Sequence, residues 1–234
     1  MSQGAIRKLR SFVIRGGRLT AAQQYALETL WPRYGIDYCA EPLDVASLFP
    51  TAQPLLVEIG FGNGETLIHL AQNHPDRNFI GIEVHPPGVG RLLNEIARFD
   101  LTNIRVIRHD AVEVLEYMLP VSSCDQFYLM FPDPWPKKRH QKRRILQPAL
   151  IDQIVRCLKP GGSFHLATDW QDYSQQMLQL LSETPVLKNR YGEGRFASEP
   201  SERPLTRFEA RGRRLGHDVW DLVFDKPKSQ SLRV

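Results

Sequence analysis

The sequence predicts an α/β protein built on a parallel sheet. From residue 54 onward, apolar runs typical of strands alternate with stretches of helical spacing. The runs are nearly continuous in apolar residues, as expected of strands that helices cover on both faces. One run leads directly into a glycine-rich turn. With 234 residues and 42% hydrophobic content, the chain is long enough to bury one sizeable core.

Residues 1–50 are predicted to form a basic N-terminal arm, and residues 51–234 the α/β domain. The arm carries five Arg or Lys between residues 7 and 18, and helical spacing begins near Thr20. Its only apolar stretch is interrupted by basic residues, and no run is long or apolar enough to span a bilayer. Three widely separated cysteines suggest neither disulfides nor a metal site. We therefore expect a soluble, cytoplasmic protein without membrane contact or bound metal.

The domain is expected to contain six strands that are separated by helices and loops. Helical spacing follows the first strand at ETLIHLAQ and the second at RLLNEIARF. The strands are expected at LLVEIG (55–60), NFIGIEV (78–84), NIRVIRHD (103–110), CDQFYLMF (124–131), GSFHLATD (162–169) and DVWDLVFDK (218–226).

Three glycines, Gly60, Gly62 and Gly64, follow the first expected strand. Glycine permits a tight turn and the close approach of a ligand to the backbone, so this turn is typical of nucleotide binding. A dinucleotide fingerprint would require its third glycine at the position of Glu65, which disfavours hydride transfer with NAD. A tight strand-to-helix connection without a ligand is the simpler alternative.

Three acidic residues fall at or near the carboxyl ends of successive expected strands: Glu58, Glu83 and Asp110. Open α/β sheets bind ligands at this edge. A carboxylate after the second strand can accept hydrogen bonds from ribose hydroxyls, and one after the third from an adenine amino group. Negative charge at the first turn suits a cationic ligand. Adenosine attached to a sulfonium fits all three, whereas three unrelated solvated carboxylates would be the alternative.

The segment FPDPWPKKRH (131–140) resembles the hallmark FPDPWPKxRHxKRR of the bacterial tRNA (guanine-N7)-methyltransferases. The resemblance extends over residues 54–225, through VEIGFGNGE, GIEV, LKPGG, ATDW and TRFEARGRRLGHDVWDL. It implies the class I methyltransferase fold, a Rossmann-like, mostly parallel seven-stranded sheet with helices on both faces and a reversed final hairpin. It also implies that S-adenosylmethionine donates a methyl group to N7 of guanosine 46 in the tRNA variable loop, forming 7-methylguanosine.

The resemblance also assigns roles to individual residues. Asp133 is implied to be catalytic. Arg207 stands where related sequences often have Lys, which keeps the positive charge but changes its geometry. The cofactor would be bound by Glu58, Gly60, Gly62, Gly64, Glu83, Asp110 and Asp133, and the substrate by Lys137, Asp169, Thr206, Arg207, Phe208 and Glu209.

Asp133 suits methyl transfer to a ring nitrogen. Prolines on both sides stiffen its loop, and Trp135 offers an aromatic face. Guanine N7 carries a lone pair that is unprotonated at neutral pH, so the reaction needs alignment more than a general base. A fixed carboxylate can stabilise the positive charge that develops on guanine. A rigid turn with a packed tryptophan is the structural alternative.

The segment KKRHQKRR (137–144) places six positive charges within eight residues, against a net charge of +4 for the whole chain. Beside a catalytic loop, such a run is typical of phosphate binding, although it could also be an ordinary solvated surface. We expect tRNA to contact Lys138, Arg139, His140, Lys142, Arg143 and Arg144.

Three other functions stay open at this point. Exocyclic amino methyltransferases also use a proline-flanked acidic loop, although FPDPW differs from their usual (N/D)PP(Y/F). An RNA-binding module that has kept the fold is disfavoured because the acidic and glycine residues are all present. An oxidoreductase would lack the third glycine. The sequence does not distinguish a monomer from a homodimer.

Overall fold

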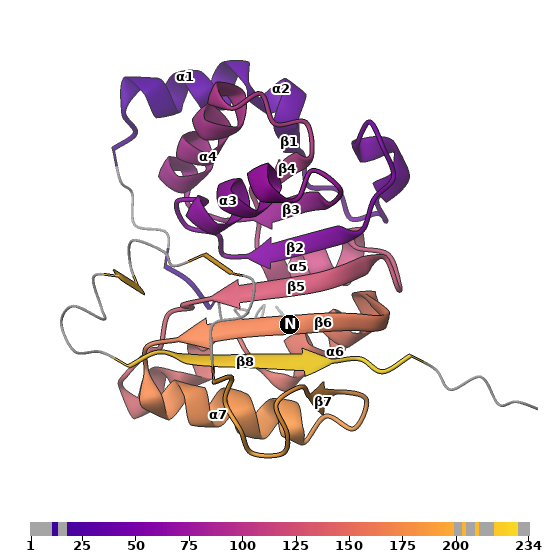
Figure 1. The fold of residues 1–234 in the computed structure, drawn as a ribbon. Coiled ribbons are helices and arrows are strands. Elements are labelled where there is room, and N and C mark those ends of the chain that lie inside the picture. The colour runs from indigo at the N-terminus through magenta and orange to yellow at the C-terminus, as the bar shows by residue number, and fades with distance from the viewer. Residues whose placement is uncertain (1–10, 14–17, 199–202, 205–208, 211–217, 229–234) are drawn as a thin grey trace, which may run out of the picture.

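The computed structural model describes residues 11–13, 18–198, 203–204, 209–210 and 218–228 (Figure 1). These residues form a sheet of eight strands in the order β1-β4-β3-β2-β5-β6-β8-β7. The strands are β1 (Gly35–Ile36), β2 (Leu55–Ile59), β3 (Asn78–Ile82), β4 (Ile104–Ile107), β5 (Cys124–Met130), β6 (Leu158–Thr168), β7 (Lys188–Asn189) and β8 (Trp220–Asp225).

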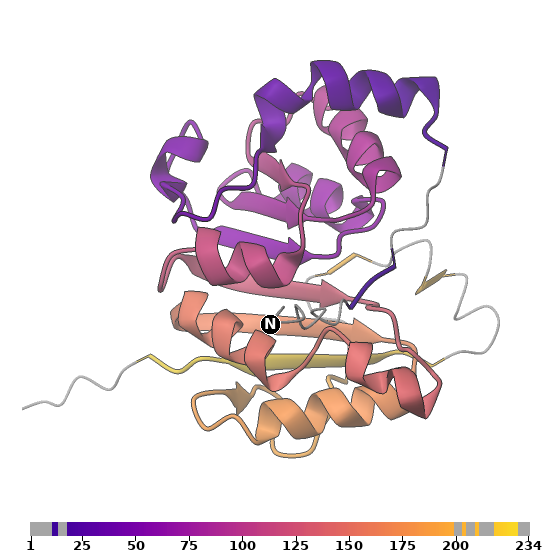
Figure 2. The ribbon, with the colours of Figure 1, turned by 180° about the vertical axis from the view of Figure 1, so that it is seen from behind.

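Helices cover both faces of this sheet (Figures 1 and 2). Two separate clusters of buried apolar side chains fill the space between helices and sheet. In one cluster, the four helices α1, α2, α3 and α4 pack against one face of the sheet. In the other, α5, η2, α6 and α7 pack against the opposite face. The helices are α1 (Ala21–Thr29), α2 (Trp31–Tyr34), α3 (Glu65–Asn73), α4 (Pro86–Arg98), α5 (Ala111–Glu113), α6 (Pro148–Cys157) and α7 (Gln171–Ser182), with short turns η1 (Val45–Leu48), η2 (Val114–Met118) and η3 (Lys138–Arg143).

The predicted fold class is confirmed. Strands β1 to β6 pair in parallel, and β8 runs antiparallel to both β6 and β7. β2 pairs with β3 on one side and with β5 on the other, because the chain runs outward from β2 through β3 to β4 and then returns to place β5 on the other side of β2. This topological switch point opens a crevice at the carboxyl ends of β2 and β5, where ligands bind in sheets of this kind.

The described sheet has eight strands, against six expected from the apolar runs and seven implied by the resemblance; the runs did not indicate β1 or β7. The two-residue strand β1 comes from the segment predicted to be an arm, and it pairs with Val106 and Ile107 at the open edge of β4. Nothing in the local sequence signals so short a strand, because its hydrogen bonds depend on an edge that the rest of the fold creates.

The helical spacing that begins near Thr20 does form a helix, α1 (Ala21–Thr29). Thr20 caps α1 in a reciprocal capping box with Gln23. The helix then packs along α4: Gln23 donates a hydrogen bond to the Pro87 carbonyl at 3.1 Å, and Asn94 donates one to the Ala22 carbonyl at 3.1 Å. This part of the predicted arm therefore lies against the domain. Among the described residues, no helix has both the length and the apolar character needed to cross a membrane.

Candidate active site

The glycine turn lies at the carboxyl end of β2, at the switch point. Gly60, Gly62 and Gly64 all have positive φ angles, of 69°, 56° and 76°. Side chains are strained in this region, so the turn depends on glycine. A Cβ added at Gly60 or Gly62 would meet no described atom within 4 Å, so the outer side of the turn is open. The predicted close approach to a ligand is therefore sterically possible here.

Glu83 stabilises this turn through hydrogen bonds. Its Oε2 accepts a hydrogen bond from the Gly62 amide at 2.9 Å. Its Oε1 accepts from the Val84 amide at 2.6 Å and the His85 amide at 3.0 Å. The carboxylate thus joins the turn to the start of α4. Oε1 already accepts two hydrogen bonds, but Oε2 accepts only one, so Glu83 can still accept from a ligand hydroxyl through Oε2.

Glu58 belongs to β2, two residues before Gly60 of the glycine turn, and its side chain is buried, with only 2% exposed. Its Oε2 has no hydrogen-bond partner among the described residues. Burial, together with the negative charge of Glu83, raises the pKa of Glu58 from its ordinary 4.5 to about 8. A buried carboxyl group without a partner is costly unless a ligand or positive charge compensates it, which makes Glu58 a candidate for function.

The raised pKa of Glu58 predicts a specific pH dependence of stability. The unfolded chain releases this proton near pH 4.5, whereas the folded protein holds it to about pH 8. The contribution of this group to the free energy of unfolding is therefore fully present below pH 4.5 and is lost as the pH rises to about 8. One proton corresponds to a slope of at most about 1.4 kcal/mol per pH unit. We expect Glu58→Gln to flatten this slope in urea unfolding between pH 5 and 8. The exposed Glu41→Gln is the control, and parallel pH profiles for all three proteins would contradict the assignment.

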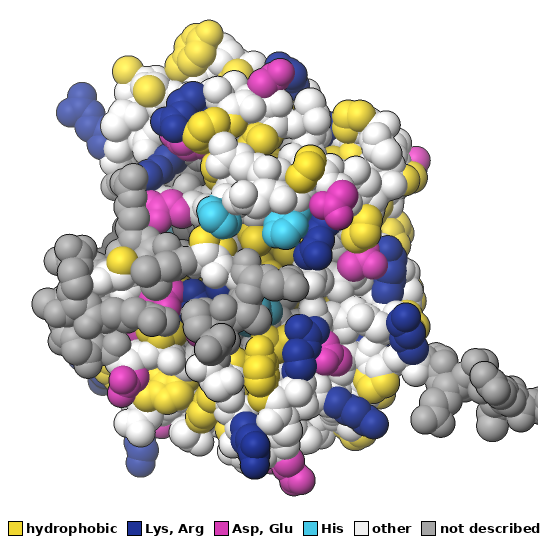
Figure 3. All heavy atoms as spheres, in the orientation of Figure 1, with side chains coloured by type: hydrophobic (Ala, Val, Ile, Leu, Met, Phe, Trp, Pro, Cys, Tyr) yellow, Lys and Arg dark blue, Asp and Glu magenta, His cyan; other side chains and the backbone are white. Residues whose placement is uncertain are grey.

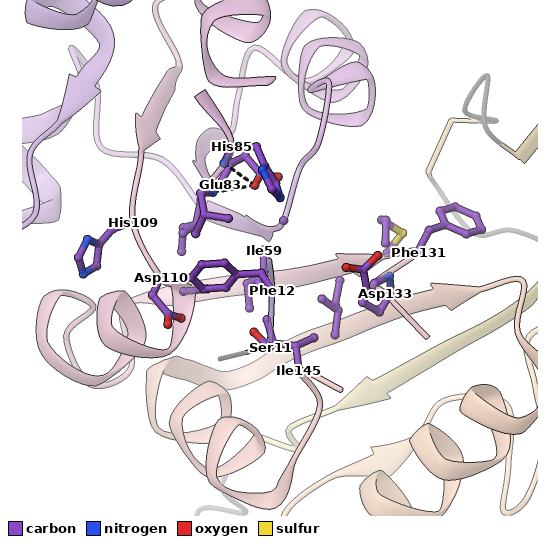
Figure 4. A pocket seen from close by; sticks show the side chains of 17 residues that line it. Ser11, Phe12, Ile59, Glu83, His85, His109, Asp110, Phe131, Asp133 and Ile145 are labelled. Atoms are coloured by element: carbon purple, nitrogen blue, oxygen red, sulfur yellow. Dashed lines mark hydrogen bonds between the residues drawn. The ribbon is translucent and has the colours of Figure 1, made fainter. Parts of the chain in front are cut away.

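Asp110 and Asp133 line the cleft that opens above the turn, and the ring of Phe12 lies between them (Figure 4). Asp110 caps α5 by accepting a hydrogen bond from the Val112 amide at 3.0 Å. Asp133 also lines a second hollow beside the cleft, together with His85 and Trp135. The Asp133 carboxylate therefore stands at the border between two adjoining cavities. Such an arrangement allows one residue to act on two molecules that meet there.

Sequence reasoning missed the contribution of residues 11–13 to this site. Ser11 and Phe12 line the cleft, and Val13 lines the adjoining hollow. The indole Nε1 of Trp135 donates a hydrogen bond to the Ser11 carbonyl at 3.1 Å. The only signal in the sequence is that Phe12 lies in the one apolar stretch of a basic segment.

Residues 131–136, here called the FPDPWP loop, have an unusual backbone. Phe131 and Trp135 both have positive φ angles, of 51° and 44°, although neither is glycine. Such strain persists only where surrounding contacts hold it. Here the Phe131 amide donates to the Ala167 carbonyl at 2.8 Å, and the Arg144 Nε donates to the Pro134 carbonyl at 2.8 Å. The loop is therefore held on both sides of Asp133.

Comparison with known proteins identifies the family of this chain. The profile of a family described as "Putative methyltransferase" matches residues 52–222. A tRNA (guanine-N(7)-)-methyltransferase from Sodalis glossinidius is 53% identical over 222 residues, covering 95% of this chain and 93% of the relative. A tRNA (guanine-N(7)-)-methyltransferase from Aeromonas hydrophila is also 53% identical, over 94% of this chain and 93% of that relative. The chain belongs to the tRNA (guanine-N7)-methyltransferase family.

The solved structures extend this likeness to the fold. A SAM-dependent methyltransferase from Aquifex aeolicus superimposes with a TM-score of 0.51 at 11% identity, covering 78% of this chain and 87% of that one. At so low an identity the match concerns the fold alone. Together with the mostly parallel sheet found here, it confirms the predicted class I methyltransferase architecture.

The position of Arg144 contradicts its predicted role. It was expected to contact RNA, but its side chain is 2% exposed. Its guanidinium donates to Asp172 and Gln176, both at 2.5 Å, and lies over the ring of Tyr173 at 4.6 Å. A cation buried among these partners supports the FPDPWP loop from inside and is not available to phosphate. The periodicity of a charge run does not reveal which member turns inward.

The other basic residues of the segment occupy η3, directly after the FPDPWP loop. Lys138, Arg139 and Lys142 are exposed, whereas His140 and Arg143 are half-buried. The Arg143 guanidinium lies 4.4 Å from the centre of the Trp135 ring, a cation–π contact. Partial desolvation, followed by the positive charges of neighbouring side chains, lowers the pKa of His140. On the face of the molecule in Figure 3, Lys and Arg side chains are scattered among Asp and Glu.

The residues assigned to substrate fall into three groups. Lys137 is exposed at the end of the FPDPWP loop, and Asp169 directly follows β6, the neighbour of β5. Thr206, Arg207 and Phe208 lie outside the described residues. Glu209 is 1% exposed and pairs with Arg203, so its carboxylate is turned into the protein. Among the described residues, no group of three His, Cys, Asp or Glu side chains could hold a metal ion.

Proposed function

We propose that this protein transfers a methyl group from S-adenosylmethionine to N7 of guanosine 46 in the variable loop of tRNA, in the cytoplasm. The observation that carries the proposal is the position of Asp133 at the border between the cleft above the glycine turn and the hollow beside Trp135. A methyl donor in the first cavity and a guanine in the second would meet at this carboxylate. The names of the relatives agree with this reaction.

The residues of the cleft fit S-adenosylmethionine. The open glycine turn leaves room for the ligand, and Glu83 and Asp110 offer acceptors for its ribose hydroxyls and adenine amino group. When bound, the cofactor supplies a methyl group on a positively charged sulfur. Glu58, whose Oε2 has no hydrogen-bond partner among the described residues, precedes the same turn in β2, and its ionised form would stabilise a nearby positive charge.

The protein groups need to align the reactants and need not remove a proton. Guanine N7 presents an unprotonated lone pair at neutral pH, so its orientation toward the methyl group limits the rate. The Asp133 carboxylate stabilises the positive charge that develops on guanine, and it can accept from the N–H donors of the base. Trp135, in the same hollow, provides an aromatic surface on which the base can stack.

The exposed part of η3 is suited to the tRNA backbone. Lys138, Arg139 and Lys142 project from a short helix that begins where the FPDPWP loop ends. Positive side chains beside the reaction site bind phosphates and release counterions, which fixes the register of the RNA.

Product analysis tests the proposed function. Unmodified tRNA is incubated with the protein and radiolabelled S-adenosylmethionine, and its nucleosides are then separated. We expect label only in 7-methylguanosine, and none when guanosine 46 is replaced by adenosine. Label on an exocyclic amino group would support the alternative amino methyltransferase, and cofactor binding without any labelled RNA would contradict both.

The charge of η3 leads to a prediction about salt. The double variant Lys138→Gln/Lys142→Gln should weaken tRNA binding and reduce the slope of log Kd against log salt concentration by roughly one unit per lysine. Cofactor affinity should stay the same. The matched control is Lys188→Gln/Lys228→Gln, which removes two exposed lysines at the opposite end of the sheet strands. Equal slopes in the two double variants would show that η3 is an ordinary solvated surface.

A further inference from the structure

A buried cluster of four polar side chains lies next to the FPDPWP loop, and of this cluster only the pair of Arg203 and Glu209 has been described above. His165 comes from β6 and Asp221 from β8, whereas Arg203 and Glu209 belong to the segment that joins β7 to β8. Their exposed fractions are 3%, 5%, 6% and 1%. Burying so many ionisable groups is expensive unless their interactions are well satisfied, so the cluster calls for a physical explanation.

Arg203 is the centre of this cluster. Its Nε donates to Asp221 Oδ1 at 2.5 Å and its Nη2 to Asp221 Oδ2 at 2.6 Å, a two-pronged pairing. Its Nη1 also donates to Glu209 Oε2, and its Nη2 to Glu209 Oε1 at 3.2 Å. One planar guanidinium thus binds two carboxylates at once, which a lysine ammonium cannot reproduce.

The charges of the cluster depend on Arg203. Two carboxylates held this close in a poorly hydrated interior repel each other strongly. Burial by itself would raise the pKa of Asp221, but hydrogen bonds from Arg203 and His165 bring it below its ordinary value. Asp221 is fixed in β8, opposite Ala167 of β6. Its pairing with the guanidinium therefore attaches Arg203 to a rigid part of the sheet.

The same guanidinium reaches the loop that carries Asp133. Its carbon lies 5.6 Å from the centre of the Phe131 ring. Phe131 lines the cleft, has a positive φ of 51°, and stands two residues before Asp133. The next residue along the segment, Pro204, lines a groove beside Gly64 of the glycine turn. Arg203 therefore packs between the sheet and the strained start of the FPDPWP loop.

We propose that Arg203 is a positioning residue for methyl transfer, which holds Phe131 and hence the Asp133 loop, and that Glu209 acts through Arg203. Glu209 matches a substrate-binding position of the family, yet its carboxylate is directed to the guanidinium. The inference rests on the proposed function, because it is the rate of that reaction that the cluster controls. Misplacing a reacting group by about 1 Å costs up to ~10²-fold in rate.

A double-mutant cycle tests this role. Single-turnover methylation is measured at saturating tRNA and cofactor for the parent, Arg203→Lys, Glu209→Gln and the double variant, with both dissociation constants and thermal unfolding recorded. We expect Arg203→Lys to lower the rate roughly 10–100-fold while both dissociation constants stay within about threefold of the parent. Glu209→Gln should add less than about twofold in the Arg203→Lys background, because its effect passes through the same group.

The matched control is Arg190→Lys, since Arg190 makes a similar two-pronged pair with Asp225 of β8 but on the surface. It should keep the parent rate. A parent rate in Arg203→Lys would overturn the proposal, as would fully additive losses, because Glu209 would then act on the substrate independently. A rate loss matched by weaker tRNA binding would also overturn it. If Arg203→Lys does not fold, Asp221→Asn takes its place in the cycle. A parent without any product would instead reject the proposed function.

Discussion

Replacing Asp133 with asparagine should lower the single-turnover rate of methyl transfer by roughly 10²–10³, the range found when one preorganised stabilising group is removed. Asparagine keeps the size of the side chain and part of its hydrogen bonding but removes the charge. Asp133 borders both cavities, so in the proposed reaction its carboxylate would lie where positive charge develops on guanine. The loss should therefore fall on the rate at saturation more than on the affinity for tRNA.

Rapid-quench assays with saturating tRNA and S-adenosylmethionine measure this rate, and filter binding gives the tRNA affinity. Asp152→Asn, at an exposed position of α6, is the control for removing one negative charge and should react at the parent rate. A parent rate in Asp133→Asn would limit Asp133 to binding.

Replacing Gly88 with alanine should have the second large effect, this time on cofactor binding. An added Cβ would lie 2.1 Å from the carbonyl oxygen of Gly62, a contact that neither backbone can accept without moving. The start of α4 and the glycine turn would separate, and the hydrogen bond from the Gly62 amide to Glu83 would be distorted. We expect an affinity loss of at least about tenfold and a stability loss of about 1–3 kcal/mol, as for other overpacked sites.

Calorimetric titration with S-adenosylmethionine and urea unfolding measure the two effects separately. Gly90→Ala is a matched control in the same helix, because its Cβ would lie 2.8 Å from the Gln23 carbonyl of α1 and away from the cleft. It should lose stability but keep cofactor affinity. If Gly88→Ala binds the cofactor as the parent does, the glycine turn does not form the cofactor site.

The sequence by itself determined the features that short segments encode. Apolar runs predicted strands β2 to β6 and β8, and the glycines between β2 and α3 predicted a turn that the structure builds with three positive φ angles. Glu58, Glu83 and Asp110 were expected to meet in one crevice at this edge of the sheet. Glu83 and Asp110 line the cleft together with Asp133, whereas Glu58 is buried within β2 and is not among the residues that line it. These predictions succeed because the carboxyl ends of parallel strands meet at one edge whatever the details of packing.

Only the tertiary structure decided which way individual side chains face. Arg144 belongs to a run of cations yet turns inward to Asp172, and Glu209 turns to Arg203. Phe12 reaches the cleft from a segment that has no recognisable motif. In loops without periodic structure, the direction of a side chain depends on partners distant in sequence, such as Asp221 for Arg203. These contacts form only when the sheet brings its strands together, and no local pattern records them.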